Sequence, residues 1–104
     1  MLKHVNSEEF KKEVIDSKKA VLVDFYATWC PPCKMLAPVL ERIANSRAEF
    51  EIVKINVDDN QDLANKYAIE FVPTMVVFKD GIAANRLSGY VEEEKIIELM
   101  SKYI

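Results

Sequence analysis

Residues 20–27 form the nearly continuous apolar run Ala20-Val21-Leu22-Val23-Asp24-Phe25-Tyr26-Ala27, and the segment Trp29-Cys30-Pro31-Pro32-Cys33 follows closely. An apolar run of this length predicts a central strand that is covered on both faces. A helical pattern comes after the cysteines, and its apolar stripe consists of Met35, Leu36, Val39, Leu40 and Ile43. We therefore expect the cysteines at the junction between a buried strand and a helix.

Further strands are predicted on both sides of this junction. Residues 51–57 have the pattern of another strand, and residues 3–5 are expected to add a short strand at the edge of the sheet. The step Asp80-Gly81 separates two apolar runs, residues 74–78 and residues 83–88. Such a step between strands predicts an antiparallel hairpin.

Three more helices complete the pattern. Asn6 or Ser7, together with Glu9, is expected to cap a first helix. A short helix begins after residues 58–60, and a last helix opens with residues 92–94, three glutamates that suit the positive end of its dipole. The side chains expected to be buried by these helices are Phe10, Val14, Leu63, Tyr67, Ile96, Ile97, Met100 and Ile104. The whole pattern predicts an α/β fold in a single domain over residues 1–104, with one mixed sheet of about five strands and about four helices.

Composition limits the possible functions. The chain has 104 residues, of which 50% are hydrophobic and two are glycine, so it can bury a core without disulfides or a structural metal. Its net charge is −3 with both signs interleaved, which argues against nucleic-acid binding. The first nine residues have no apolar segment typical of a secretory signal, and no apolar run approaches the length of a membrane span. We therefore expect a cytoplasmic protein that binds no membrane.

The two cysteines admit three explanations: half of a zinc site, two buried thiols, or a redox pair. Zinc needs four ligands, and the chain has no other cysteine and a single histidine, His4, far upstream. At the first turn of a helix, the dipole and the backbone N–H groups stabilise a thiolate at Cys30. Cys33 lies one turn later and can close a ring with Cys30. This context favours a redox pair, and we expect no metal.

Asp24 is an acid at a position where the buried strand calls for an apolar residue. An unpaired carboxylate in such a strand is costly, so we expect a raised pKa or a charged partner. The alternative is a polar residue at the edge of the sheet that faces water. Lys54, on the neighbouring predicted strand, is either the partner of Asp24 or an ordinary solvated lysine.

Residues 24–34 closely resemble the active-site segment of thioredoxins. The resemblance extends over nearly the whole chain in the right order, through Pro38, Lys54-Ile55-Asn56-Val57-Asp58, Val72-Pro73-Thr74, Phe78-Lys79-Asp80-Gly81 and Gly89. It implies the thioredoxin fold and the activity of a general protein-disulfide reductase that needs no cofactor. It also implies two kinds of partner, a thioredoxin reductase and proteins that contain disulfides, and we expect the chain itself to be a monomer.

The resemblance further implies catalytic roles for single residues. Cys30 becomes the nucleophile and Cys33 the resolving thiol, with Pro31-Pro32 between them in the active site. Asp24 is implied to accept the proton of Cys33, and Lys54 is implied to pair with Asp24.

A second group of residues is implied to bind substrate. Pro73 resembles the cis-proline that faces the dithiol, and the backbone of Val72 is expected to pair with a substrate peptide. Thr74 follows Pro73 and belongs to the same substrate-binding segment. Trp29 is expected at the rim of the site. Gly89 is expected to permit close backbone approach at the same surface.

Two details depart from the usual thioredoxin pattern. Thioredoxins commonly have Gly-Pro between the cysteines, and here Pro31 withdraws one N–H from the Cys30 thiolate and stiffens the reduced loop. Both effects favour the disulfide over the dithiol and predict a strong reductant. A glycine is common before the cis-proline, where this chain has Glu70-Phe71, and Phe71 is expected to enlarge an apolar contact surface.

Three functions are consistent with these residues. The first is reduction of cytosolic protein disulfides through a mixed disulfide, with regeneration by a thioredoxin reductase. The second reverses the direction of the same chemistry, as an oxidase or isomerase in an oxidising compartment. The third is a binding module whose apolar rim, Trp29, Phe71 and Val72, docks a partner in either redox state. The first is preferred, because the sequence lacks a secretory signal and a histidine before the second cysteine.

Overall fold

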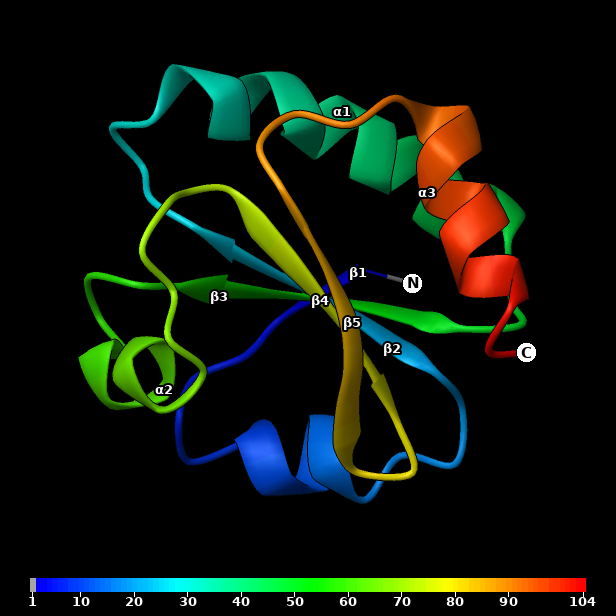
Figure 1. The fold of residues 1–104 in the computed structure, drawn as a ribbon, viewed down its shortest axis with the longest axis horizontal. Helices are drawn as coiled ribbons and strands as arrows, with labels where there is room; N and C mark the ends of the chain where they lie inside the picture. Colours follow the sequence, from blue (N-terminus) through cyan, green and yellow to red (C-terminus); the bar gives the residue numbers. More distant parts are fainter. Residues whose placement is uncertain (1) are drawn as a thin grey trace.

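A computed structural model describes residues 2–104. Within this range it contains five strands and four helical segments, coloured along the chain in Figure 1. In chain order they are β1 (Leu2–His4), η1 (Lys11–Ile15), β2 (Val21–Tyr26), α1 (Pro31–Ser46), β3 (Glu51–Asn56), α2 (Gln61–Lys66), β4 (Thr74–Lys79), β5 (Ile82–Ser88) and α3 (Glu93–Ser101). None of the described helices combines the length and the hydropathy needed to cross a membrane.

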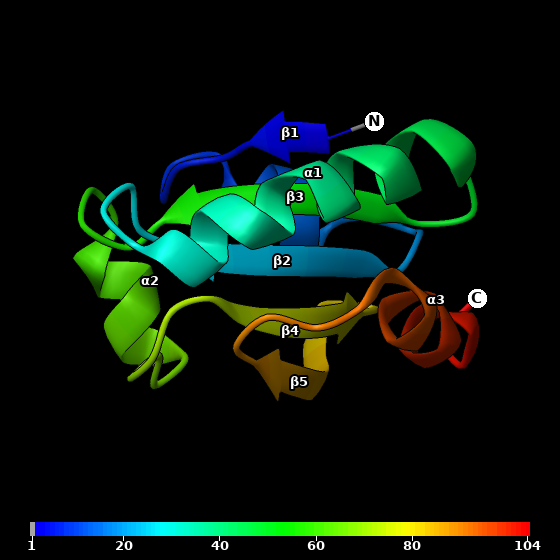
Figure 2. The same ribbon diagram turned by 90° about the horizontal axis from the view of Figure 1, so that it is seen from above.

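The strands form one mixed sheet in the order β1-β3-β2-β4-β5, which Figure 2 shows from above. β1 and β2 both pair with β3 in parallel, whereas β4 runs antiparallel to β2 and β5 runs antiparallel to β4. Asp80 and Gly81 form the turn between β4 and β5 with φ values of 52° and 78°. Positive φ at both turn positions suits a two-residue hairpin, so the predicted hairpin and mixed sheet are confirmed.

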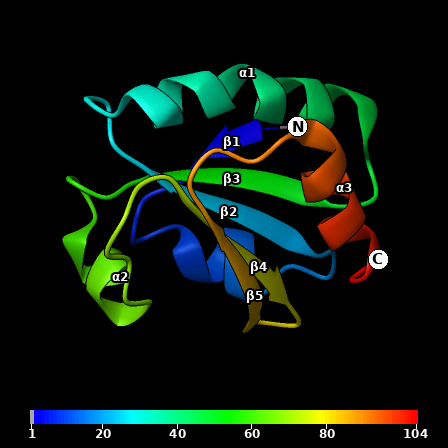
Figure 3. The same ribbon diagram turned by 45° about the horizontal axis from the view of Figure 1, so that its top comes forward.

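Helices cover both faces of the sheet. α1 and α3 pack on one face, and η1 and α2 pack on the other, as Figure 3 shows with α1 above the sheet and α2 below it. Side chains alternate along β2, so Leu22 belongs to the core beneath α1 and α3, whereas Val23 and Phe25 belong to the opposite core. Asp24 comes two residues after Leu22 and is therefore on the same face of the sheet, the α1 side, where the cysteines are.

The first helical segment differs from the predicted α-helix in its winding. The expected pair of hydrogen bonds forms in the turn before it: Glu9 N donates to Asn6 Oδ1 at 3.0 Å, and Asn6 N donates to Glu9 Oε1 at 3.1 Å. Phe10, which directly precedes the helix, makes no side-chain cap hydrogen bond. The chain after this turn winds as a π-helix over Lys11–Ile15. The wider winding still buries Phe10 and Val14, as predicted.

Two predicted core residues are on the surface. The Met35 side chain is 60% exposed, because it lies about 100° round α1 from the buried Leu36 and so falls outside the stripe that faces the sheet. Ile104 is 61% exposed, because α3 ends at Ser101 and its buried face does not reach the end of the chain. The buried positions of α3 are Ile96 and Met100, as predicted, whereas Ile97, also expected to be buried, is only partly buried.

Candidate active site

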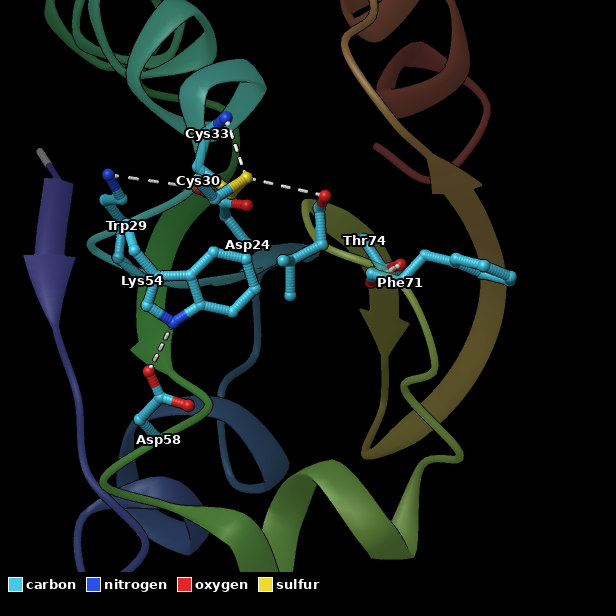
Figure 4. The surroundings of a disulfide bond; sticks show 9 residues. Asp24, Trp29, Cys30, Cys33, Lys54, Asp58, Phe71 and Thr74 are labelled. Atoms are coloured by element: carbon cyan, nitrogen blue, oxygen red, sulfur yellow. Dashed lines mark hydrogen bonds and ion pairs between the residues drawn. A yellow bond between two sulfur atoms is a disulfide. The ribbon is translucent and has the colours of Figure 1, made fainter.

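The Cys30–Cys33 disulfide lies at the N-terminus of α1 (Figure 4), just beyond the end of β2. Cys30 caps the helix, and its Sγ accepts a hydrogen bond from Cys33 N at 3.2 Å. Both cysteines are 3% exposed. The strand-to-helix junction expected from the sequence thus brings the two sulfur atoms into bonding contact.

Pro31 and Pro32 occupy the first turn of α1. A proline there loses no helical hydrogen bond, because the first N–H groups of a helix have no partner within it. Neither proline has an N–H to give to sulfur, so the donor at this turn is Cys33 N. The positive end of the α1 dipole acts at the same place. Together they stabilise Cys30 as a thiolate, the nucleophilic form, once the disulfide is reduced.

Asp24 is fully buried, and neither of its carboxylate oxygens has a hydrogen-bond partner among the described residues. Burial raises the pKa of Asp24 from 3.8 to about 7, and the positive charge of Lys54 opposes this rise. The expectation of a buried acid with a raised pKa is confirmed, and the alternative of a sheet-edge position is wrong. A carboxyl group with a pKa near neutrality is suited to accept and release protons.

Lys54 is the charged neighbour of Asp24. The two residues are direct register partners between β2 and β3, and Lys54 Nζ lies 3.9 Å from Asp24 Oδ2. The lysine is buried, so the interpretation as a solvated surface lysine is wrong. A hollow of about 190 Å³ opens beside the pair, lined by Tyr26, Ala27, Thr28, Cys33, Lys34, Ala37 and Lys54. The hollow thus borders both Lys54 and the resolving position, Cys33.

The other side of the disulfide is formed by the segment before β4. The Val72–Pro73 peptide bond is cis, as the resemblance implied, and the Val72 carbonyl oxygen lies 3.5 Å from Cys30 Sγ. Thr74 is buried, and its Oγ1 donates to the Phe71 carbonyl oxygen at 2.7 Å. The structure therefore places Thr74 as a support of the loop that carries Val72, with its hydroxyl facing inward.

Gly89 directly follows β5, and its backbone lies against this segment, as expected. Gly89 N donates to the Pro73 carbonyl oxygen at 2.8 Å, which ties the end of β5 to the loop. A Cβ atom at Gly89 would meet nothing within 4 Å, so this backbone contact does not itself require a glycine. What this position requires is its φ of 81°, which glycine adopts at no steric cost.

Exposed aromatic side chains border the site. Trp29 is 66% exposed, as expected for the rim, and Phe71 is 70% exposed with its ring pointing away from the disulfide (Figure 4). Trp29 Nε1 donates to Asp58 Oδ2 at 2.9 Å. Sequence reasoning missed Asp58 as a site residue, because its place in the run Asp58-Asp59-Asn60 indicated only the start of a helix.

These features define a class of protein. A cysteine pair that closes a disulfide at a helix N-terminus exchanges two electrons with other thiols and disulfides. Within residues 2–104, no group of three histidine, cysteine or acidic side chains is placed to bind a metal ion. The fold and the site are those of a thiol–disulfide oxidoreductase.

Comparison with known proteins identifies the family. The family model described as "Thioredoxin" matches residues 1–102. The chain is 39% identical to a thioredoxin of Mycoplasma genitalium over 101 residues, which is 97% of this chain and 99% of that protein. It is 41% identical to a thioredoxin of Pyropia yezoensis and 38% identical to one of Synechocystis, in each case over 96% of this chain and 94% of the relative. The chain belongs to the thioredoxin family and has its fold.

The raised pKa of Asp24 predicts how stability depends on pH. Between pH 3.8 and about pH 7 the unfolded chain releases the Asp24 proton while the folded protein keeps it. Folding stability from this residue is therefore complete at low pH and is lost as the pH rises, by about 4 kcal/mol in total. Asp24→Asn, which cannot titrate, should remove this loss.

Denaturant unfolding of the oxidised protein and of Asp24→Asn, from pH 4 to pH 8, measures the effect. The difference in unfolding free energy between the two should move in favour of the variant across this range. If both proteins lose stability in parallel, Asp24 titrates as an ordinary acid and the argument from burial is wrong.

Proposed function

We propose that this protein reduces disulfides in other proteins, with Cys30 as the nucleophile. The observation that carries the proposal is the position of Cys30, at a helix N-terminus and 3.5 Å from a backbone carbonyl of an exposed loop. A substrate peptide that pairs with the Val72 backbone would bring its own disulfide to Cys30. The exposed rings of Trp29 and Phe71 offer apolar contacts on either side.

The reaction then takes two exchange steps. The Cys30 thiolate attacks one sulfur of the target disulfide, forms a mixed disulfide and displaces the other target sulfur as a thiolate. Cys33 loses its proton to the Asp24 carboxylate and attacks Cys30 Sγ. This step closes the Cys30–Cys33 disulfide and releases the second target sulfur. Two electrons pass from the protein to the target, and Lys54 favours the charged form of Asp24 that takes up the proton.

The cycle needs a partner that restores the dithiol, and we propose a thioredoxin reductase for that role. Because thiols are kept reduced in the cytoplasm, we also propose that the protein acts there. We propose that residues 1–104 act as one domain and as a monomer, with protein disulfides as substrates. Family membership supports these proposals.

Substitution of each cysteine tests the order of the steps. Cys33→Ser should accumulate a covalent complex with a disulfide-containing protein, because nothing resolves the mixed disulfide. Cys30→Ser should form no complex, because Cys33 lacks both the helix-cap position that stabilises a thiolate at Cys30 and the contact of Cys30 with the Val72 carbonyl. Non-reducing electrophoresis and mass spectrometry would detect the complexes. Normal multiple turnover by Cys33→Ser would contradict the scheme.

The reduction potential tests the direction of the reaction. Pro31 and Pro32 give no N–H to a Cys30 thiolate, which favours the disulfide form over the dithiol. Equilibration with glutathione buffers should therefore give a potential of about −270 mV or lower, as in a reductant suited to the cytosol. A value of about −120 to −180 mV would identify a donor or isomerase of disulfides, and the cytoplasmic reductase would have to be abandoned.

Substitution of Phe71 tests whether its exposed ring contacts protein substrates. Because its ring is 70% exposed, Phe71→Ser should leave stability nearly unchanged. It should lower kcat/KM for a protein substrate such as insulin about tenfold, since an apolar contact of one ring is lost. The rate with hydroxyethyl disulfide, which is too small to span the surface, should stay the same.

Ile82→Ser provides the matched control. Ile82 is 66% exposed and lies at the other end of the β4–β5 hairpin, where it pairs with Lys79. Its substitution removes a similar exposed apolar side chain away from the disulfide and should affect neither substrate. Equal losses with the two variants would show that Phe71 makes no specific contact.

A further inference from the structure

Lys54 has a second contact besides Asp24. Its Nζ lies 3.9 Å from Asp24 Oδ2 and 4.4 Å from the centre of the Tyr26 ring. The ammonium group therefore lies within range of a carboxylate and of an aromatic face at once. An ammonium above an aromatic ring at this distance is attracted by the electron-rich face of the ring.

The sheet explains why these groups meet. Tyr26 follows Asp24 by two residues on β2, so both side chains are on the α1 side of the sheet. Lys54 is opposite Asp24 on β3, and Tyr26 is opposite Asn56, so the Tyr26 ring reaches the lysine diagonally. On the other side of β3, His4 of β1 is the register partner of Lys54, and its ring meets the Tyr26 ring edge-on at 6.2 Å.

The Tyr26 contact is important because little else holds the lysine. The separation of 3.9 Å from Asp24 is longer than a hydrogen bond, and Asp24 has no hydrogen-bond partner among the described residues. Lys54 also lines two hollows, one of about 190 Å³ and one of about 480 Å³, and Tyr26 lines both of them too. A lysine without the ring could turn toward either hollow and be hydrated there, away from the carboxylate.

We propose that Tyr26 is a positioning residue, whose ring holds the Lys54 ammonium against Asp24 and thereby sets the pH at which Asp24 takes up and releases its proton. The consequence for the resolution step rests on the proposed function, in which Asp24 accepts the proton of Cys33. What the Tyr26 ring determines is the position of the Lys54 charge beside Asp24. This positioning applies to the oxidised protein as well as to the reduced one.

Other titratable or charged groups also lie around this site. They are His4 on β1, Glu9 and Asp59 on the loops that line the larger hollow, and Cys33 and Lys34 on α1. Burial raises the pKa of Tyr26, and the charges of Asp24 and Asp59 act in the same direction. The tyrosine ring therefore stays neutral through the range in which Asp24 titrates, and Cys33 does not titrate while it is in the disulfide.

The test is a carboxyl ¹³C NMR titration of Asp24 in the oxidised protein. In Tyr26→Leu, Lys54 loses its aromatic partner, and the midpoint should move upward by about half a pH unit. In Tyr26→Phe, which keeps the ring and loses only the hydroxyl, the midpoint should equal that of the wild type. A downward movement in Tyr26→Leu would mean that the ring only shields Asp24 from water, and would overturn the proposal.

A double-mutant cycle shows whether the effect passes through Lys54. Lys54→Met removes the charge, so Tyr26→Leu should cause no further movement of the Asp24 midpoint in that background. The same movement in both backgrounds would overturn the proposal. Circular dichroism of each variant confirms that it is folded.

The pH profile of mixed-disulfide resolution in the reduced protein separates the proposal from the proposed function. If the profile moves with the Asp24 midpoint in Tyr26→Leu, both are supported. If the Asp24 midpoint moves while the profile does not, the positioning by Tyr26 stands and the role of Asp24 as proton acceptor is wrong.

Discussion

The pairing of β2 with a neighbour on each side is the constraint on which the site depends. A strand paired on both edges and covered on both faces leaves its central side chains no access to water, and Asp24 is one of them. The same pairing fixes what surrounds the end of the strand. The parallel register with β3 puts Lys54 opposite Asp24, and the antiparallel register with β4 puts Thr74 opposite Phe25. The segment before β4 is thereby brought to the place where the chain leaves β2 for Cys30.

The fold gives two acidic groups opposite environments within this small volume. Cys30 caps a helix and receives an N–H, both of which stabilise its negative charge. Asp24 receives no hydrogen bond from the described residues and is buried, which destabilises its negative charge. A carboxyl group with a pKa of about 7 is half ionised at neutral pH, and its buried charge lowers folding stability. In the proposed function, this loss of stability accompanies a proton acceptor for Cys33.

Local patterns predicted the elements of this fold, and contacts distant in sequence account for most of what they missed. The apolar run around Asp24 and the Asp80-Gly81 step predicted β2 and the hairpin, because each depends on neighbouring residues alone. For Lys54, strand order allowed either a partner of Asp24 or a solvated lysine, and the register of β2 with β3 decides for the pair. The bond from Trp29 to Asp58 joins two loops, and the exposure of Met35 depends on which side of α1 meets the sheet. For Pro73, the sequence pattern alone allowed only a proline at the start of a strand, and the cis bond came from the family resemblance.

The disulfide lies between a buried acid–lysine pair and the exposed side chains at the rim of the site. In the proposed function, proton transfer uses the buried pair, Asp24 and Lys54, on the side of β2, β3 and α1. The proposed substrate contacts are exposed: Phe71 lies before β4, and Trp29 lies in the loop before Cys30. Exposed side chains can change with little effect on stability, whereas the buried pair cannot. In the proposed function, the exposed contacts can therefore change with the partner protein while the buried Asp24–Lys54 pair stays the same.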